Sequence, residues 1–369
     1  MVGISCLVTM QMAQASGLDT AYDSAAAIGL ANADLATSEN VSAAANAAAG
    51  LAWQPGKQLM VGSMGQYRNS SVKLGNNSIL ANSGRIISPN YLYASWKPKD
   101  SDFGLSFAYH TPIGLDNNWP TSVTGGDGRT DIRADRFAMD GIYAVNSNLA
   151  FAIGADMYKS KMILTQGGAL FSGKDAAAFS GHASMKYKFS PSWVVAASLH
   201  KGAKINASSG GGNSATLQLP DEIKVGLSKA MVNNISVEMD VRYSRWSQLK
   251  NLNVVSNGVV SQSNNLSSLK NDWGVMLGSA WHWRPDAQLR LGFAYDSGRS
   301  TLDAGELRTL FSNQKAMHFT TGLGADIFGV HVDAGYAYVH SPKRTITGAL
   351  TGTYRERRQI VACDITKKF

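Results

Sequence analysis

The side chains that most often do chemistry in proteins are thinly spread along this sequence. Its seven histidines show none of the short spacings that are typical of zinc ligands, and the G-x-S-x-G sequence of serine hydrolases does not occur. The run Gly125-Gly126-Asp127-Gly128 resembles one calcium-binding repeat, but a flexible loop explains a single copy better. These residues therefore predict no catalytic site, no metal and no cofactor.

Three charged residues, Glu238, Asp240 and Arg242, are close enough in sequence to act together. An apolar residue separates each from the next, and strict alternation is typical of a β-strand with one polar and one apolar face. A catalytic cluster is one explanation. Salt bridges that line a closed barrel explain the trio better, with the apolar residues from Ile235 to Tyr243 facing lipid.

The same alternation recurs along most of the chain and predicts fourteen strands. The connections between them alternate between tight turns and long loops without exception. That asymmetry is typical of an outer-membrane barrel with short periplasmic turns and long external loops, and an even strand number leaves both termini periplasmic. The expected strands are 57–69, 86–97, 102–112, 131–145, 148–158, 177–189, 192–201, 216–230, 235–249, 271–284, 287–297, 314–327, 329–341 and 358–369.

Composition agrees with a membrane barrel. No apolar run approaches the roughly 20 residues that a transmembrane helix needs, and the net charge of +8 comes from scattered residues that do not predict nucleic-acid binding. We predict an all-β fold, a 14-stranded antiparallel transmembrane β-barrel in the outer membrane of a Gram-negative cell. Tryptophans near the expected strand ends are either core residues or, in better agreement with the loop pattern, interfacial girdles: Trp96, Trp193, Trp246, Trp281 and Trp283.

The first 56 residues do not alternate, and we expect them to divide into two parts. Residues 1–15 end in Ala13-Gln14-Ala15, which predicts cleavage of a secretory signal peptide, with an ordinary tail as the alternative. Residues 16–56 are rich in alanine and too poor in large apolar residues to form a domain alone. We expect a small helical hatch in the lumen or, alternatively, a disordered periplasmic tail, before a barrel at 57–369.

Several short sequences follow one another in an order that is typical of a known family. They are Ser16-Gly17-Leu18, Ser24-Ala25, Ile28-Gly29, Ala49-Gly50-Leu51-Ala52, Thr111-Pro112-Ile113-Gly114-Leu115, Leu219-Pro220-Asp221 and Tyr243-Ser244-Arg245-Trp246. The chain thereby resembles the FadL/TodX-like outer-membrane transporters of long-chain fatty acids and hydrocarbons. The resemblance implies an N-terminal hatch and a ligand pocket that includes Leu18, with Tyr22 as a further candidate. Ala47-Ala48 replaces the family's usual Asn-Pro, which leaves the anchoring of the hatch open.

Apolar patches inside otherwise polar loops are the candidate sites of ligand capture. Exposed apolar clusters usually bind something, although packing of loop against loop is equally open. Lys159 and Lys201 could bind a ligand carboxylate, and solvation or contacts with lipopolysaccharide phosphates explain them as well. The apolar candidates are Met162, Ile163, Leu164, Leu170 and Phe171 in the expected loop 159–176, and Leu307, Leu310 and Phe311 in the expected loop 298–313.

The function that the family resemblance implies is passive uptake of hydrophobic compounds, either long-chain fatty acids or hydrocarbons. Burial of alkyl groups would supply affinity, at about 0.8 kcal/mol per CH₂. The alternative is a general diffusion porin for small polar solutes; an outer-membrane lipase is a third class, and we expect no enzyme. Expected partners are the ligand, outer-membrane lipid, lipopolysaccharide and the barrel-assembly machinery, which would recognise the C-terminal Phe369.

Overall fold

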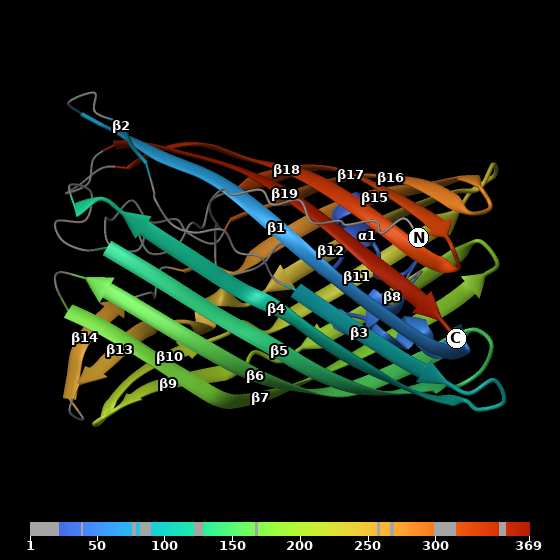
Figure 1. Ribbon diagram of the computed structural model, residues 1–369, viewed down its shortest axis with the longest axis horizontal. Coiled ribbons are helices and arrows are strands. Elements are labelled where there is room, and N and C mark those ends of the chain that lie inside the picture. Colours follow the sequence, from blue (N-terminus) through green and yellow to red (C-terminus); the bar gives the residue numbers. More distant parts are fainter. Residues whose placement is uncertain are drawn as a thin grey trace.

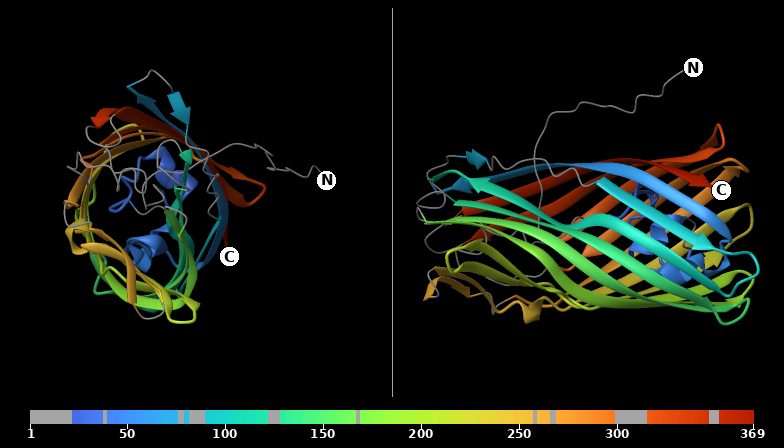
Figure 2. Two further views of the ribbon diagram at one scale, coloured as in Figure 1. Left: turned by 90° about the vertical axis from the view of Figure 1, so that its left-hand side faces the viewer. Right: turned by 60° about the horizontal axis from the view of Figure 1, so that its bottom comes forward.

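Antiparallel pairing continues from each long strand to the next until the last strand returns to the first. β19 pairs with β1 from Gln58↔Lys368 to Leu74↔Gly352, and this pairing closes the sheet into the ring that Figure 2 shows end-on. The computed structural model describes residues 22–37, 40–75, 79–81, 90–121, 128–166, 169–256, 259–265, 269–298, 315–346 and 352–369. Within these residues fourteen strands form the ring, which confirms the predicted fold class.

The fourteen strands of the ring are labelled in Figure 1. Their bounds are β1 (Gly56–Leu74), β3 (Asn90–Lys97), β4 (Phe103–Trp119), β5 (Gly128–Ala144), β6 (Leu149–Gln166), β7 (Ala169–Ser190), β8 (Trp193–His200), β11 (Glu222–Ala230), β12 (Ile235–Ser244), β15 (Asp272–Arg284), β16 (Ala287–Asp296), β17 (Ala316–Ile327), β18 (Val330–Ile346) and β19 (Gly352–Lys368).

Shorter strands extend the sheet at the end of the barrel that carries the long connections (Figure 1). β9 and β10 form a hairpin whose edges pair with β7 and β13, and β13 and β14 form a second hairpin. The predicted loops 202–215 and 250–270 therefore consist largely of strand, because a polar segment still pairs when a neighbouring strand extends far enough to meet it. The bounds are β2 (Ile79–Ala81), β9 (Lys204–Gly210), β10 (Asn213–Gln218), β13 (Asn251–Ser256) and β14 (Val259–Asn265).

Most other predicted bounds are shifted as well, because strands such as β1, β4, β18 and β19 extend further toward the long connections than expected, and three of the differences have a local cause or consequence. The expected loop 159–176 is mostly strand, since β6 continues to Gln166 and β7 begins at Ala169. The expected strand 216–230 is interrupted at Pro220, which has no amide hydrogen for a strand ladder. The expected strand 235–249 ends at Ser244 and continues into the 3₁₀ turn η3 (Trp246–Gln248).

The two faces of the wall have opposite chemistry. On β12, Val237, Met239 and Val241 are 38%, 45% and 42% exposed on the outside, whereas Glu238 and Asp240 are buried inside. Large apolar side chains are exposed around the whole ring, as expected where lipid surrounds the wall. The predicted sidedness of this strand is therefore correct.

The predicted aromatic girdle is correct only in part. Trp96, Trp281 and Trp283 are exposed on the outside near strand ends. Trp246, by contrast, is fully buried, so its prediction as a girdle residue is wrong. The reason is local: the chain leaves the strand at Ser244, and the η3 turn carries Trp246 into an apolar cluster.

Tight turns gather at the end of the barrel opposite the long connections (Figure 1). Asn233 and Asn234, in the four-residue connection between β11 and β12, have φ angles of 62° and 58°, left-handed values that asparagine adopts more readily than most residues. The amide of Lys57 donates to the carbonyl of Phe369, so the start of β1 and the C-terminus also meet at this end. Among the described residues, no helix is long and apolar enough to cross a membrane.

A short piece of the chain lies inside the ring, as the end-on view of Figure 2 shows. We call residues 22–37 and 40–53 the lumenal segment. It contains the helix α1 (Ala25–Gly29) and the 3₁₀ turns η1 (Val41–Ala45) and η2 (Ala48–Trp53). Ser24 caps α1 by accepting a hydrogen bond from the amide of Ala27, which explains why so short a helix begins there.

Candidate functional site

Four glycines on adjacent strands form the surface on which the first half of the lumenal segment lies. Gly278 pairs with Gly292 across β15 and β16, and Gly322 pairs with Gly335 across β17 and β18. A Cβ atom on Gly335 would lie 2.4 Å from the carbonyl oxygen of Ala25, and one on Gly292 would lie 2.5 Å from the carbonyl carbon of Leu30. The absence of side chains at these four positions therefore makes the space that α1 and its following turn occupy. We call them the glycine surface.

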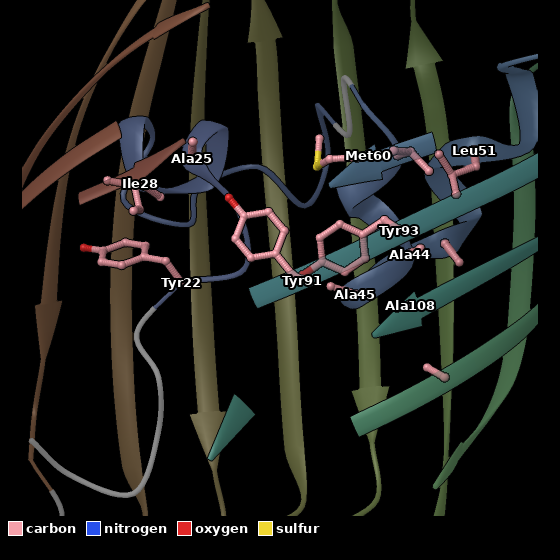
Figure 3. Close-up of a cluster of buried hydrophobic side chains, with 14 of the residues drawn as sticks. Tyr22, Ala25, Ile28, Ala44, Ala45, Leu51, Met60, Tyr91, Tyr93 and Ala108 are labelled. Atoms are coloured by element: carbon pink, nitrogen blue, oxygen red, sulfur yellow. The ribbon is translucent and has the colours of Figure 1, made fainter. Parts of the chain in front are cut away.

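Small and aromatic side chains pack against the rest of the lumenal segment. Tyr22, Ile28 and Leu51 belong to one buried cluster with wall residues such as Tyr93 and Ala108, and Figure 3 shows how they face one another. Alanines recur where the wall approaches η1 and η2, because a larger side chain would fill the space of the turns. They are Ala108, Ala138, Ala144, Ala150 and Ala152.

Carboxylates of the wall bind amide groups of the lumenal segment. Glu238 accepts hydrogen bonds from the amides of Ala36 at 2.5 Å and Thr37 at 2.7 Å. Asp240 accepts one from Leu35 at 3.2 Å. Two members of the charged trio thus line the inner wall and hold the lumenal segment through hydrogen bonds to its amides, rather than through the salt bridges that the sequence predicted.

Further wall side chains bind the remaining backbone groups. Arg136 donates to the carbonyl of Ala45 at 2.7 Å, Ser184 accepts from the amide of Ala49 at 3.1 Å, and Asp364 accepts from the amide of Ala25 at 2.8 Å. Ala47, which precedes η2, makes no side-chain cap. The wall, rather than a local Asn-Pro, therefore anchors this part of the lumenal segment.

Buried ion pairs line the inner face of the barrel wall. Arg136 lies 2.7 Å from Asp156, Arg290 lies 2.6 Å from Asp333, and Arg68 lies 2.8 Å from Glu356. A buried charge without a partner is costly, and pairing offsets that cost. The third member of the charged trio, Arg242, is only partly buried and is also paired, at 2.7 Å from Asp296.

A second apolar cluster lies on the inner face of the wall toward the end with the long connections. We call it the long-loop cluster. Met162 and Leu164 on β6 and Phe171 on β7 are buried in it, so the structure brings together three of the predicted capture residues. Other members come from the neighbouring strands and the extra hairpins: Leu115, Ile132, Ile205, Leu217, Trp246 and Leu252.

A cavity of about 130 Å³ lies between the long-loop cluster and the lumenal segment. Ile113 and Leu219 line it from the apolar side, and Asp23 and Asn46 line it from the lumenal segment. Lys201, one of the two predicted carboxylate-binding residues, also lines this cavity and lies 2.9 Å from Asp221. Although partial burial alone would raise the pKa of Asp221, hydrogen bonds from Gly202, Lys201 and Gln248 hold it below its usual value.

The other predicted site residues are not in this arrangement. Ile163 is half-buried on the opposite face of β6, and Lys159 is exposed with its Nζ 5.3 Å from the centre of the Phe137 ring. Tyr22 lies in the cluster around the lumenal segment, where its hydroxyl is 2.7 Å from Nδ1 of His318. Leu18, Leu307, Leu310, Phe311 and the side chain of Leu170 lie outside the described residues.

Similarity to known proteins agrees with this architecture. The family described as outer membrane protein transport protein (OMPP1/FadL/TodX) matches residues 168–369, more than half of the chain. The chain belongs to this family. It is an outer-membrane β-barrel of a family of transport proteins.

Individual relatives are distant in sequence. Outer membrane protein P1 of Haemophilus influenzae is 22% identical over 312 residues, which cover 69% of this chain and 66%, just under two thirds, of the relative. A FadL homologue of Pseudomonas aeruginosa has a TM-score of 0.85 at 14% identity, covering 96% of this chain and 100% of that one. The toluene transporter TodX of P. putida has a TM-score of 0.71 at 14% identity, covering 89% and 94%. These structures share the fold.

Proposed function

We propose that this barrel mediates passive uptake of small hydrophobic compounds across the outer membrane. The observation that carries the proposal is the long-loop cluster, a group of large apolar side chains on the inner face of the wall, outside the part that packs against the lumenal segment. An open pore for water-soluble solutes has no need of such a group in its lumen. A compound that buries alkyl or aromatic surface there gains about 0.8 kcal/mol per CH₂.

The lumenal segment would act as a hatch in this proposal, corresponding to the expected division at residues 16–56. It lies across the lumen on the glycine surface and is hydrogen-bonded to the wall, so it supports a barrel closed to bulk water. Lys201 lines the cavity and is the cation best placed to bind a ligand carboxylate, which would replace Asp221 as the partner of its ammonium group. Cleavage after residue 15, lipopolysaccharide contacts and recognition of Phe369 during assembly remain predictions.

Uptake measurements with a matched pair of variants test the proposal. Leu164→Asn replaces an apolar side chain of the long-loop cluster, whereas Ile163→Asn makes the same kind of change on the opposite face of the strand. At limiting ligand, Leu164→Asn should lower uptake of a radiolabelled fatty acid or of toluene about tenfold, the equivalent of roughly two lost CH₂ contacts. Ile163→Asn should transport like the unmodified protein. Equal uptake by both variants would argue against the long-loop cluster as the capture site.

A diffusion porin for polar solutes is the second candidate, which the ion-paired inner wall favours. Planar-bilayer recordings separate the two functions, because a hatch that closes the lumen permits little steady current. A large, constant open-channel current from the unmodified protein would support the porin.

A further inference from the structure

Two histidines that are far apart in the sequence are direct neighbours on the inner wall. His182 on β7 and His200 on β8 pair across the strands, and their rings stack with centroids 4.9 Å apart and 4° between the planes. Asp156 on β6 places Oδ1 3.0 Å from Nδ1 of His182. One donor atom from each of the three residues lies within 4.8 Å of the other two.

The remaining polar atoms of the three side chains are held by other groups. Nε2 of His182 lies 2.6 Å from Oδ1 of Asp140, and His200 hydrogen-bonds to the backbone of Asn46. Ser180 donates to the second oxygen of Asp156 at 3.0 Å. Metal-binding histidines usually tie their second nitrogen to a carboxylate or a backbone carbonyl in this way, which fixes the ring and its tautomer.

One atom of the cluster has an unused lone pair. Nε2 of His200 is buried, and in the described part of the chain it has no hydrogen-bond partner. Because the other nitrogen of this ring is engaged with Asn46, Nε2 presents a lone pair rather than a proton. A buried acceptor without a donor costs free energy, and a bound cation would satisfy it.

We propose that Asp156, His182 and His200 form a binding site for a divalent transition metal of the Zn²⁺ type. Two imidazole nitrogens and one carboxylate oxygen suit Zn²⁺ and its neighbours, whereas Ca²⁺ and Mg²⁺ prefer oxygen ligands alone. A tetrahedral ion with bonds near 2.1 Å needs donors about 3.4 Å apart, which small side-chain rotations supply. His200 also lines the cavity of about 130 Å³, which leaves room for a water as the fourth ligand.

The guanidinium of Arg136 competes with this metal for the carboxylate of Asp156. It lies 2.7 Å from the same Oδ1 of Asp156 and 3.3 Å from Nδ1 of His182, and it also donates to the carbonyl of Ala45. A metal therefore displaces a cation from Asp156, while Asp140 keeps a negative charge beside the site. Because Arg136 and His200 both hold the lumenal segment, through Ala45 and Asn46, the site lies at the junction of wall and hatch.

Metal titration of the full-length chain tests the proposal. The detergent-solubilised protein is treated with chelator, and Zn²⁺ binding is measured by calorimetry, with Co²⁺ absorption as a readout of the ligand set. We expect one equivalent to bind, with a d–d spectrum of four-coordinate Co²⁺. His200→Gln should weaken binding about tenfold or more. His282→Gln, which changes a wall histidine of β15 outside the cluster, should bind like the unmodified protein.

A variant that tightens binding keeps the test decisive even if His200→Gln fails to fold. Arg136→Gln removes the competing cation, so its affinity for Zn²⁺ should rise about tenfold, a gain that misfolding cannot produce. Folding of each variant is checked by heat-modifiable migration in gels. The proposal is overturned if the unmodified protein binds no Zn²⁺ at micromolar concentration, or if His200→Gln and His282→Gln bind it equally well.

Discussion

Asp34 illustrates at the scale of one residue what the enclosed lumen does to a side chain. Burial in the lumenal segment raises the pKa of Asp34 to about 7. The positive charges of Lys224 and Arg290 oppose this rise in pKa, and the negative charges of Glu238 and Asp23 add to it. A carboxyl group in water titrates near pH 4. The docked lumenal segment therefore favours the protonated form of Asp34.

Docking of the lumenal segment should consequently depend on pH. A raised pKa means that Asp34 contributes its full stabilisation below about pH 4 and loses it as the pH rises through about 7. Amide protection factors of residues 25–37, corrected for intrinsic exchange, should fall between about pH 4 and pH 7 and change little above that range. Asp34→Asn should remove this fall, whereas Asp326→Asn at the exposed end of β17 should leave it unchanged. A fall of the same size in Asp34→Asn would contradict the assignment.

Single residues also show where sequence reasoning ended. The alternation along 235–249 was enough to place Glu238 on the inner face, but its partners, the amides of Ala36 and Thr37, are about 200 positions earlier in the chain. The two histidines of the proposed metal site are likewise 18 residues apart, outside any short ligand spacing (200 − 182). Each of the two histidines is nine residues from Pro191, which lies in the tight turn between β7 and β8. Because antiparallel strands pair residues at equal distances from their turn, this count could have predicted that the two histidines are neighbours.

At the scale of elements, four strands share one adaptation to the helix that they hold. The glycine surface runs across β15, β16, β17 and β18, and each glycine removes a side chain where α1 or its following turn approaches. Glycine weakens a strand. Backbone hydrogen bonds to the strands on both sides offset this weakening. No residue with a Cβ atom could lie so close to α1 and its following turn.

Filling this space should dislodge the lumenal segment. Gly335→Val places a side chain within about 2.4 Å of the carbonyl oxygen of Ala25, and such overpacking costs about 1–3 kcal/mol. We expect steady current in planar bilayers and higher sensitivity of cells to bulky polar antibiotics. Gly141→Val on β5, where a Cβ meets nothing within 4 Å, is the matched control and should stay closed. If both variants stay equally closed, the glycine surface does not seat the segment.

At the scale of the whole molecule, the solvent on each side decides which residues stabilise the fold. The outer face exposes Met139, Ile153, Leu291 and Phe319 at 50–73%, a distribution that water would penalise and acyl chains do not. Closure by β19 and β1 leaves the ring without a free edge. Apolar burial inside is concentrated in the long-loop cluster and around the lumenal segment, with a smaller group of Val72, Trp119 and Tyr354 elsewhere on the wall.

Lipid exposure of the outer face predicts the response to added charge. Met239→Lys, on the outer face of β12, should lower the free energy of unfolding in lipid vesicles by about 2–4 kcal/mol, because the ammonium loses its hydration in the bilayer. Met231→Lys, beside the tight turn at the rim, should cost at most about 1 kcal/mol, since its ammonium reaches water. Denaturant titrations in vesicles measure both. Equal costs at the two positions would mean that β12 does not lie in the hydrocarbon region.

The sequence by itself determined the strand count, the face of β12 that meets lipid and the alternation of short and long connections. These properties follow from a period of two and from turn residues, which act over a few positions. Only the tertiary structure decided that residues 22–37 and 40–53 lie within the ring, that Trp246 is buried, and that Asp156, His182 and His200 meet. Such contacts depend on strand register and ring closure, which join positions that no local pattern relates.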